Sequence, residues 1–314
     1  MASSSLATQI SPAVSQFQNL NIVRGADNLS DDVLNTPAGP FLRSKIHAVP
    51  QGARVAHIDN LIHIISSNGT TIDTATFSKN TVGRPNIGAP SRRSAQFSEG
   101  YVVSPYWHNT DSSPVAFFST TWSVPRIPET VDGQILYLFN SMEPDTFESV
   151  IQPVLQFGTT PAGGGNYWAI ASWFVIGSDV YYTPLTQVLP GRSLTGVITL
   201  EKTMKDLDTN ATSFSYNSVF EGFPISSLSM SSDLELKWLQ ESLEIHGPTG
   251  PTELPRGKTT MSSINIMNQD GLRPTVTWAP CNATGVTDNT DGFGCSIVVN
   301  SGHNGKIDII YPLQ

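Results

Sequence analysis

The sequence predicts an all-β sandwich of antiparallel sheets, and three observations lead there. Only 14% of the 314 residues are charged, while Gly and Pro number 25 and 22. Apolar runs rarely exceed eight residues, and they are rich in Val, Ile, Tyr, Trp and Thr, as strands bounded by turns are. A chain of this length buries one large core or two modest ones.

Residues 1–97 differ from the rest of the chain in charge. They hold 8 Lys and Arg against 5 Asp and Glu, whereas residues 98–314 hold 9 against 21, so a basic leader precedes an acidic body. Runs at 61–65 and 71–72 around Asn68-Gly69 predict a hairpin in the leader. We expect an N-terminal extension over 1–97, either a docked prosegment or an ordinary extension, and a β-sandwich domain over 98–314.

Strand signals are dense in the body of the chain. The strongest block lies between residues 150 and 200, where three apolar runs are separated by a Gly-rich tip and a Pro-Gly turn. Within it, Gln156 has apolar neighbours and is either a solvent-facing residue of a half-buried strand or a group placed for chemistry. The expected strands are 115–124, 134–139, 150–157, 167–176, 194–200, 212–220, 261–267, 275–278, 296–300 and 306–311.

The segment 233–245 is ambiguous. Leu236, Leu239 and Leu243 have helical spacing, whereas Leu234, Leu236 and Trp238 alternate as in a strand. The residues alone slightly favour a short helix.

Composition excludes several classes of function. A net charge of −9 and a pI of about 5.0 argue against nucleic-acid or anionic-membrane partners. No run of 18 apolar residues exists to span a membrane. The six histidines are scattered without metal-ligand spacing, and neither a phosphate-binding loop nor a serine-hydrolase elbow is present. We therefore expect neither a metal nor another cofactor.

The two cysteines and the N-terminus bear on the compartment. Cys281 and Cys295 enclose a polar loop and are either a disulfide or two thiols in a reducing compartment. The first residues lack a basic start followed by an apolar signal core, so a cytosolic location stays open.

Carboxylate chemistry remains, because several Glu residues lie near apolar segments. A pair of carboxyl groups would hydrolyse a glycoside. Alternatively, one Glu would take a proton from water while a Gln amide N–H stabilises the oxyanion of a tetrahedral intermediate.

Five segments together suggest a family. In order and spacing they resemble motifs of the fungal glutamic peptidases, over about residues 115–266. The segments are Trp122-Ser123-Val124-Pro125, Val154-Leu155-Gln156-Phe157-Gly158, Tyr167-Trp168-Ala169-Ile170-Ala171-Ser172-Trp173-Phe174, Pro190-Gly191-Arg192-Ser193-Leu194 and Trp238-Leu239-Gln240-Glu241.

The resemblance implies a fold, an activity and a set of residues. It implies a concanavalin-like sandwich, a secreted acid-acting zymogen with a basic prosegment, and a strand rather than a helix at Trp238–Glu241. Gln156 matches the family's catalytic glutamine and Glu241 its catalytic glutamate, which would be general base and then general acid. Further residues would bind a polypeptide substrate, namely Tyr137, Tyr167, Trp168, Trp173 and Trp238.

This sequence departs from the family pattern at several positions. The family's Trp and Asp are missing near 137–142, and Ser172 and Ile170 stand where a Glu and a Trp are expected. Two alternatives on the same sandwich therefore stay open: a non-catalytic carbohydrate-binding protein that takes a glycan, and a glycosidase. Aromatic rings stack on sugar or peptide groups, although some of these rings are expected in the core.

Overall fold

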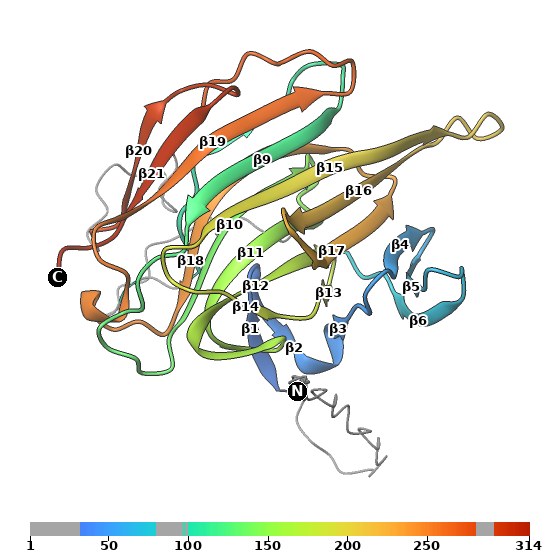
Figure 1. Ribbon diagram of the computed structural model, residues 1–314. Coiled ribbons are helices and arrows are strands. Elements are labelled where there is room, and N and C mark those ends of the chain that lie inside the picture. Colours follow the sequence, from blue (N-terminus) through green and yellow to red (C-terminus); the bar gives the residue numbers. More distant parts are fainter. Residues whose placement is uncertain (1–31, 80–96, 98–99, 281–291) are drawn as a thin grey trace, which may run out of the picture. The chain divides into compact units, whose positions relative to one another are not determined.

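The computed structural model describes residues 32–79, 97, 100–280 and 292–314. Within these ranges nearly every regular element is a strand, and the strands form two large sheets and a separate hairpin. Figure 1 shows β9, β15 and β16 of one sheet lying across β10, β11 and β12 of the other. The predicted all-β sandwich is confirmed.

One large sheet has nine strands in the described part of the chain, in the order β3-β13-β12-β11-β10-β18-β7, with β14 paired to β12 and β8 to β18. Its strands are β3 (Ile46–Ala48), β7 (Gly100–Val103), β8 (Tyr106–His108), β10 (Ile135–Pro144), β11 (Ser149–Thr160), β12 (Gly163–Ile176), β13 (Asp179–Tyr182), β14 (Thr186–Gln187) and β18 (Leu236–His246).

The other sheet has ten strands among the described residues, in the order β20-β21-β19-β9-β15-β16-β17-β4-β5-β6. They are β4 (Arg54–Ile58), β5 (Leu61–Ile65), β6 (Thr71–Thr76), β9 (Val115–Ser123), β15 (Ser193–Lys205), β16 (Thr212–Phe220), β17 (Phe223–Ser232), β19 (Lys258–Asn268), β20 (Gly294–Val299) and β21 (Gly305–Ile310). The remaining elements are the hairpin β1 (Val33–Thr36) and β2 (Gly39–Leu42) and two 3-10 turns, η1 (Arg43–Lys45) and η2 (Pro251–Glu253).

The N-terminal segment contributes to both sheets. Strand β3 pairs in parallel with β13, and β4 pairs in parallel with β17, whereas the other ladders of the two described sheets are antiparallel. The predicted hairpin is β5–β6, with its turn closed by hydrogen bonds between Ser66 and Thr70. The assignment of residues 1–97 as a removable prosegment stays a prediction.

Apolar side chains form three clusters. Two combine residues from both sheets and make up the core between them, for example Leu155 with Trp122, and Ile151 with Tyr216. The third lies on the other face of the nine-stranded sheet, where Phe41 of β2 packs among Phe139 and its neighbours. Successive side chains of a strand point to opposite faces, so this sheet is covered on both sides.

Two expectations about local structure are wrong. The segment 233–245, for which a short helix is favoured, contains most of strand β18, as the family resemblance implied. Both faces of this strand are buried, so its sequence lacks the alternation of apolar and polar residues that marks a half-buried strand. The strand expected at 275–278 is irregular: only Ala279 bridges to Tyr106, and the backbone N–H of Trp278 donates to the Asn300 side chain.

The two sheets approach closely at Gly196 of β15. A Cβ atom placed there would lie 2.4 Å from Asn140 Oδ1 and 2.8 Å from Pro153 Cγ, both on the facing sheet. We expect Gly196→Ala to lower the free energy of unfolding by about 1–3 kcal/mol, the usual cost of overpacking a core. Denaturant titration measures this change.

Gly250→Ala is the matched control, because nothing lies within 4 Å of a Cβ at that position. Equal stabilities of the two variants would contradict the close approach of the sheets.

Candidate functional site

A polar row crosses the outer face of the nine-stranded sheet, the face turned away from the second sheet. Gln156 of β11 is in register with Tyr137 of β10, and Tyr137 is in register with Glu244 of β18. Residues in register share a face, so the three side chains lie on one side. All three are fully buried.

Glu241 lies on the opposite face. It is in register with Asn140, three residues from Tyr137, and no register shift lies between them. Successive side chains of a strand alternate between its two faces, so residues an odd number of positions apart point in opposite directions. Glu241 therefore points into the core between the sheets. The structure therefore does not bring Gln156 and Glu241 together, contrary to the expectation that they act on one water molecule.

The surroundings of Glu241 are those of a structural group. Thr120 Oγ1 of the second sheet donates a 2.5 Å hydrogen bond to Glu241 Oε1, and Oε2 has no hydrogen-bond partner in the described part of the protein. Burial raises the pKa of this carboxyl well above its usual value, against the opposing effect of the Thr120 hydrogen bond.

The outer face is covered by the tip of the β1–β2 hairpin. The Tyr137 hydroxyl donates to the Asn35 carbonyl at 3.1 Å, and Gln152 Nε2 of β11 donates to the Pro37 carbonyl. The backbone N–H of Gly39 lowers the pKa of the Glu244 carboxyl, so the hairpin also approaches this residue. Tyr137 and Gln152, from adjacent strands, thus donate hydrogen bonds to the main chain of one short peptide segment, and Glu244 lies beside it.

Opposing effects act on the pKa of the Glu244 carboxyl. Burial raises its pKa, while the His246 hydrogen bond and charge and the Gly39 N–H lower it. His246 Nε2 lies 2.9 Å from Glu244 Oε1. Burial, then the Glu244 charge, also raises the pKa of the Tyr137 hydroxyl, which stays protonated and able to donate.

A second polar group adjoins this row. The Ser104 hydroxyl donates to Gln240 Oε1 at 2.6 Å and lies 2.9 Å from the Ser242 hydroxyl. Sequence reasoning included Glu244 among the glutamates near apolar segments without assigning it a role, and it missed Gln152. The signal that would have found Glu244 is the polar alternation Gln240, Ser242, Glu244, His246, which has strand period and marks one face.

The Gln156 amide is turned toward the glycine-rich tip. Its Nε2 donates to Thr160 Oγ1 at 2.9 Å and to the Gly163 carbonyl at 3.3 Å. Gly164 has a φ of +111°, and a Cβ there would lie 3.1 Å from Gln156 Nε2. Glycine is required here both for the backbone conformation and for the approach of the amide.

The predicted aromatic residues fall into different environments. Tyr137 and Trp173 are buried on the outer face. Trp168 lies in the core between the sheets, 5.3 Å from the Phe157 ring, so it is not placed to meet a substrate. Tyr167 is partly exposed beside the glycine tip.

Trp238 belongs to a partly exposed aromatic cluster at the far end of the outer face. His108 stacks on it with ring centroids 4.1 Å apart, and the Tyr106 and Phe147 rings also contact it. Asp145 Oδ1 accepts a hydrogen bond from Trp238 Nε1 and lies 2.9 Å from His108 Nε2. This arrangement fixes the indole ring in place.

The expectations about the cysteines, a metal site and a membrane span are addressed here for the described residues. Cys281 lies outside them, so its pairing with Cys295 of β20 stays a prediction. Among described residues, no group of three or more His, Cys, Asp or Glu side chains has an arrangement that would hold a metal ion. None of the described helical segments has the length and apolar character needed to cross a membrane.

No protein-family model and no curated protein sequence matches this chain. Among solved structures, it is similar to scytalido-glutamic peptidase bound to a peptide-based transition-state analogue. The TM-score is 0.40 and the identity 11%, over 68% of this chain and 98% of that one. A second structure of that peptidase, with a transition-state analogue inhibitor, gives 0.38 and 12% over the same shares. The resemblance is distant.

The position of Glu241 gives a stability prediction. A carboxyl group with a raised pKa in the folded state stabilises the fold below its unfolded pKa, and this contribution is lost as pH rises toward the folded pKa. We expect Glu241→Gln to gain stability relative to the natural chain between pH 5 and 8. The gain should approach about 1.4 kcal/mol per pH unit.

Urea titrations at pH 5, 6.5 and 8 measure the change, with the exposed Glu201→Gln as control for net charge. A stability difference that stays constant over this range would show that Glu241 ionises in the fold as it does in solution.

Proposed function

We propose that this protein is a peptide hydrolase that uses one carboxyl group and a glutamine amide on the outer face of the nine-stranded sheet. The observation that carries the proposal is the hairpin on this face. Tyr137 and Gln152 donate hydrogen bonds to two main-chain carbonyls, the groups that every peptide substrate presents, and the Gly39 N–H lowers the pKa of Glu244 beside them. They recognise main chain rather than a particular side chain.

The expected dyad changes in both members. Glu244 takes the role that the family resemblance gave to Glu241, since Glu244 shares a face with both glutamines and Glu241 does not. Gln152 is the amide that donates to a peptide carbonyl, and Gln156 lies farther along the same strand and face. The Oε1 atoms of both glutamines have no described hydrogen-bond partner and are suited to accept substrate N–H groups.

The chemistry follows from these groups. Ionised Glu244 takes a proton from water as the water oxygen bonds to the peptide carbonyl carbon. The resulting oxyanion accepts a hydrogen bond from the Gln152 amide, while the Tyr137 hydroxyl holds a second main-chain carbonyl of the substrate. Protonated Glu244 then gives its proton to the amide nitrogen as the C–N bond breaks, which leaves a carboxylic acid and an amine.

The hairpin keeps the face closed. It removes Glu244 from water, and burial raises the pKa of the carboxyl above its usual value. Once the hairpin leaves, water reaches Glu244 and its pKa falls toward the ordinary value for Glu. Activity is then expected in mildly acidic solution, at about pH 4–6, where a glutamate is ionised. This gives the N-terminal extension a prosegment role at residues 33–42.

The test compares hydrolysis of a quenched peptide library at pH 3–7 by the full chain, by full-length Phe41→Ser and by a chain beginning at Arg43. Phe41→Ser removes the apolar contact of the hairpin with the outer face. We expect little activity from the full chain and more from the other two. In an active form, Glu244→Gln should lower kcat/KM by about 10²-fold or more, and Gln152→Ala by about 10²-fold.

Glu241→Gln is the matched control, because it makes the same change on the same strand but on the other face. It should retain activity within a few-fold. Loss of activity in Glu241→Gln with retention in Glu244→Gln would restore the original pair. Folded proteins that are inert in every form, judged by circular dichroism, would refute the peptidase.

A further inference from the structure

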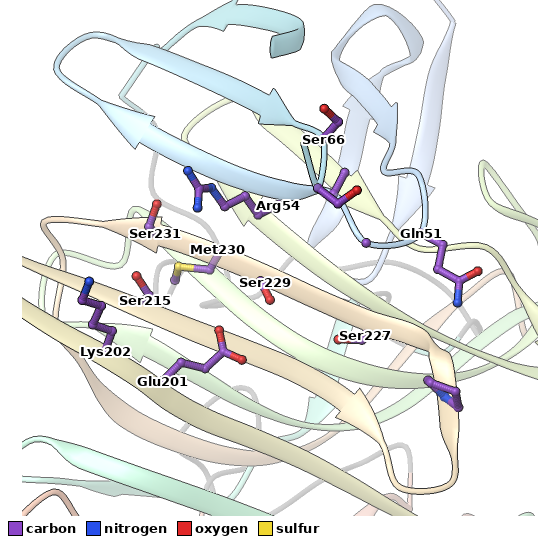
Figure 2. Close-up of a pocket in the computed structure, with 14 residues that line it drawn as sticks. Gln51, Arg54, Ser66, Glu201, Lys202, Ser215, Ser227, Ser229, Met230 and Ser231 are labelled. Carbon is purple, nitrogen blue, oxygen red and sulfur yellow. The ribbon is translucent and has the colours of Figure 1, made fainter. Parts of the chain in front are cut away.

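The outer face of the ten-stranded sheet carries a hollow unrelated to the candidate site. Its volume is about 790 Å³, within the range of ligand pockets. A second hollow of about 760 Å³ adjoins it and shares Arg54, Lys202, Ser215 and Ser231. Figure 2 shows Arg54 on one side, Lys202 and Glu201 on the other, and serines between them.

Strand register explains this arrangement. Lys202 of β15 is in register with Ser215 of β16, and Ser215 with Ser231 of β17. In the next row, Ser229 of β17 is in register with Arg54 of β4. Two long cationic side chains thus stand at opposite edges of a floor of hydroxyl groups.

The two cations lack charged partners. Neither Arg54 nor Lys202 forms an ion pair with another residue in the described part of the chain, and both are exposed. Glu201 is the carboxylate that lines the first hollow, so the lining of that hollow has two positive charges and one negative charge. The adjoining hollow adds Lys205 and three carboxylates, Asp59, Asp206 and Asp233. The first hollow is therefore the locally positive part, and on a chain of net charge −9 it favours an anionic group on its ligand.

The floor offers hydroxyl chemistry. Asn217 Nδ2 donates to the Ser227 and Ser229 hydroxyls at 2.7 and 2.9 Å, which leaves both hydroxyl protons to donate elsewhere. The Ser215 and Ser231 hydroxyls have no hydrogen bond to another described side chain or backbone group. A hydroxyl both donates and accepts, as do the hydroxyl groups of a sugar.

We propose that this hollow binds an acidic oligosaccharide, a short sugar chain bearing carboxylate or sulfate groups. Arg54 and Lys202 bind the anionic groups, while Ser215, Ser229 and Ser231 bind ring hydroxyls. None of the residues lining the hollow is aromatic, so it offers no ring on which a nucleic-acid base would stack. The proposal is independent of the peptidase, because it uses the opposite side of the sandwich.

Isothermal titration of the full chain at low salt tests the site. The probes are a trigalacturonate, a heparin-derived tetrasaccharide and neutral maltotriose. We expect at least one acidic probe to bind, at least tenfold more tightly than maltotriose, with affinity that falls as salt rises. The two acidic probes distinguish a carboxylate from a sulfate ligand.

Arg54→Met and Lys202→Met should each weaken binding about tenfold, and Ser231→Ala should weaken it several-fold with unchanged salt dependence. Arg273→Met, an exposed cation outside the hollow, is the matched control and should bind as the natural chain does. Failure of both acidic probes to bind at millimolar concentration, or binding that neither cation substitution weakens, would overturn the proposal.

Discussion

The structure depends on a sheet that is buried on both faces. The central strands β10, β11, β12 and β18 are covered by the second sheet on one side and, on the other, by an outer cluster to which Phe41 of the hairpin belongs. Backbone groups are satisfied by the ladders, but polar side chains on either face must find partners of their own. On the outer face the carbonyls of Asn35 and Pro37 supply them for Tyr137 and Gln152.

This arrangement ties stability to binding. A buried carboxyl and two buried amides are costly to keep, and apolar side chains of similar size would cover the hairpin at lower cost. The Tyr137 hydroxyl and the Gln152 amide offset this cost by donating hydrogen bonds to the main chain of the hairpin. The inner carboxyl, Glu241, differs in that it meets a side-chain hydroxyl, Thr120, and no main-chain segment outside the sheets. The two glutamates of β18 therefore lie in separate environments: Glu241 is packed between the sheets, and Glu244 lies on the outer face near the hairpin.

Composition and strand-length runs were sufficient to predict the fold class, because turns and β-branched residues mark strands wherever they lie. The site was harder to predict, since it depends on which face each residue occupies. Trp238-Leu239-Gln240-Glu241 has the family spacing, yet Glu244, three residues later, faces Gln156 across the sheet. A shift of one residue moves every side chain of a strand to the opposite face of the sheet. The spacing of motifs along the sequence does not determine which face a given residue occupies. The hairpin contacts join residues about 100 positions apart, and local patterns do not reveal them.

The outer faces of the two sheets differ in how accessible they are to a ligand. The outer face of the nine-stranded sheet is covered by the hairpin of its own chain, so under the proposed function a substrate must first displace residues 33–42. The ten-stranded sheet alternates buried and partly exposed positions along β16 and β17, and its hydroxyl face is already open. Arg54 comes from the N-terminal segment and Lys202 from the body. A ligand held by both would link β4 to β15 across the sheet, and this link would persist after the hairpin on the other face had left.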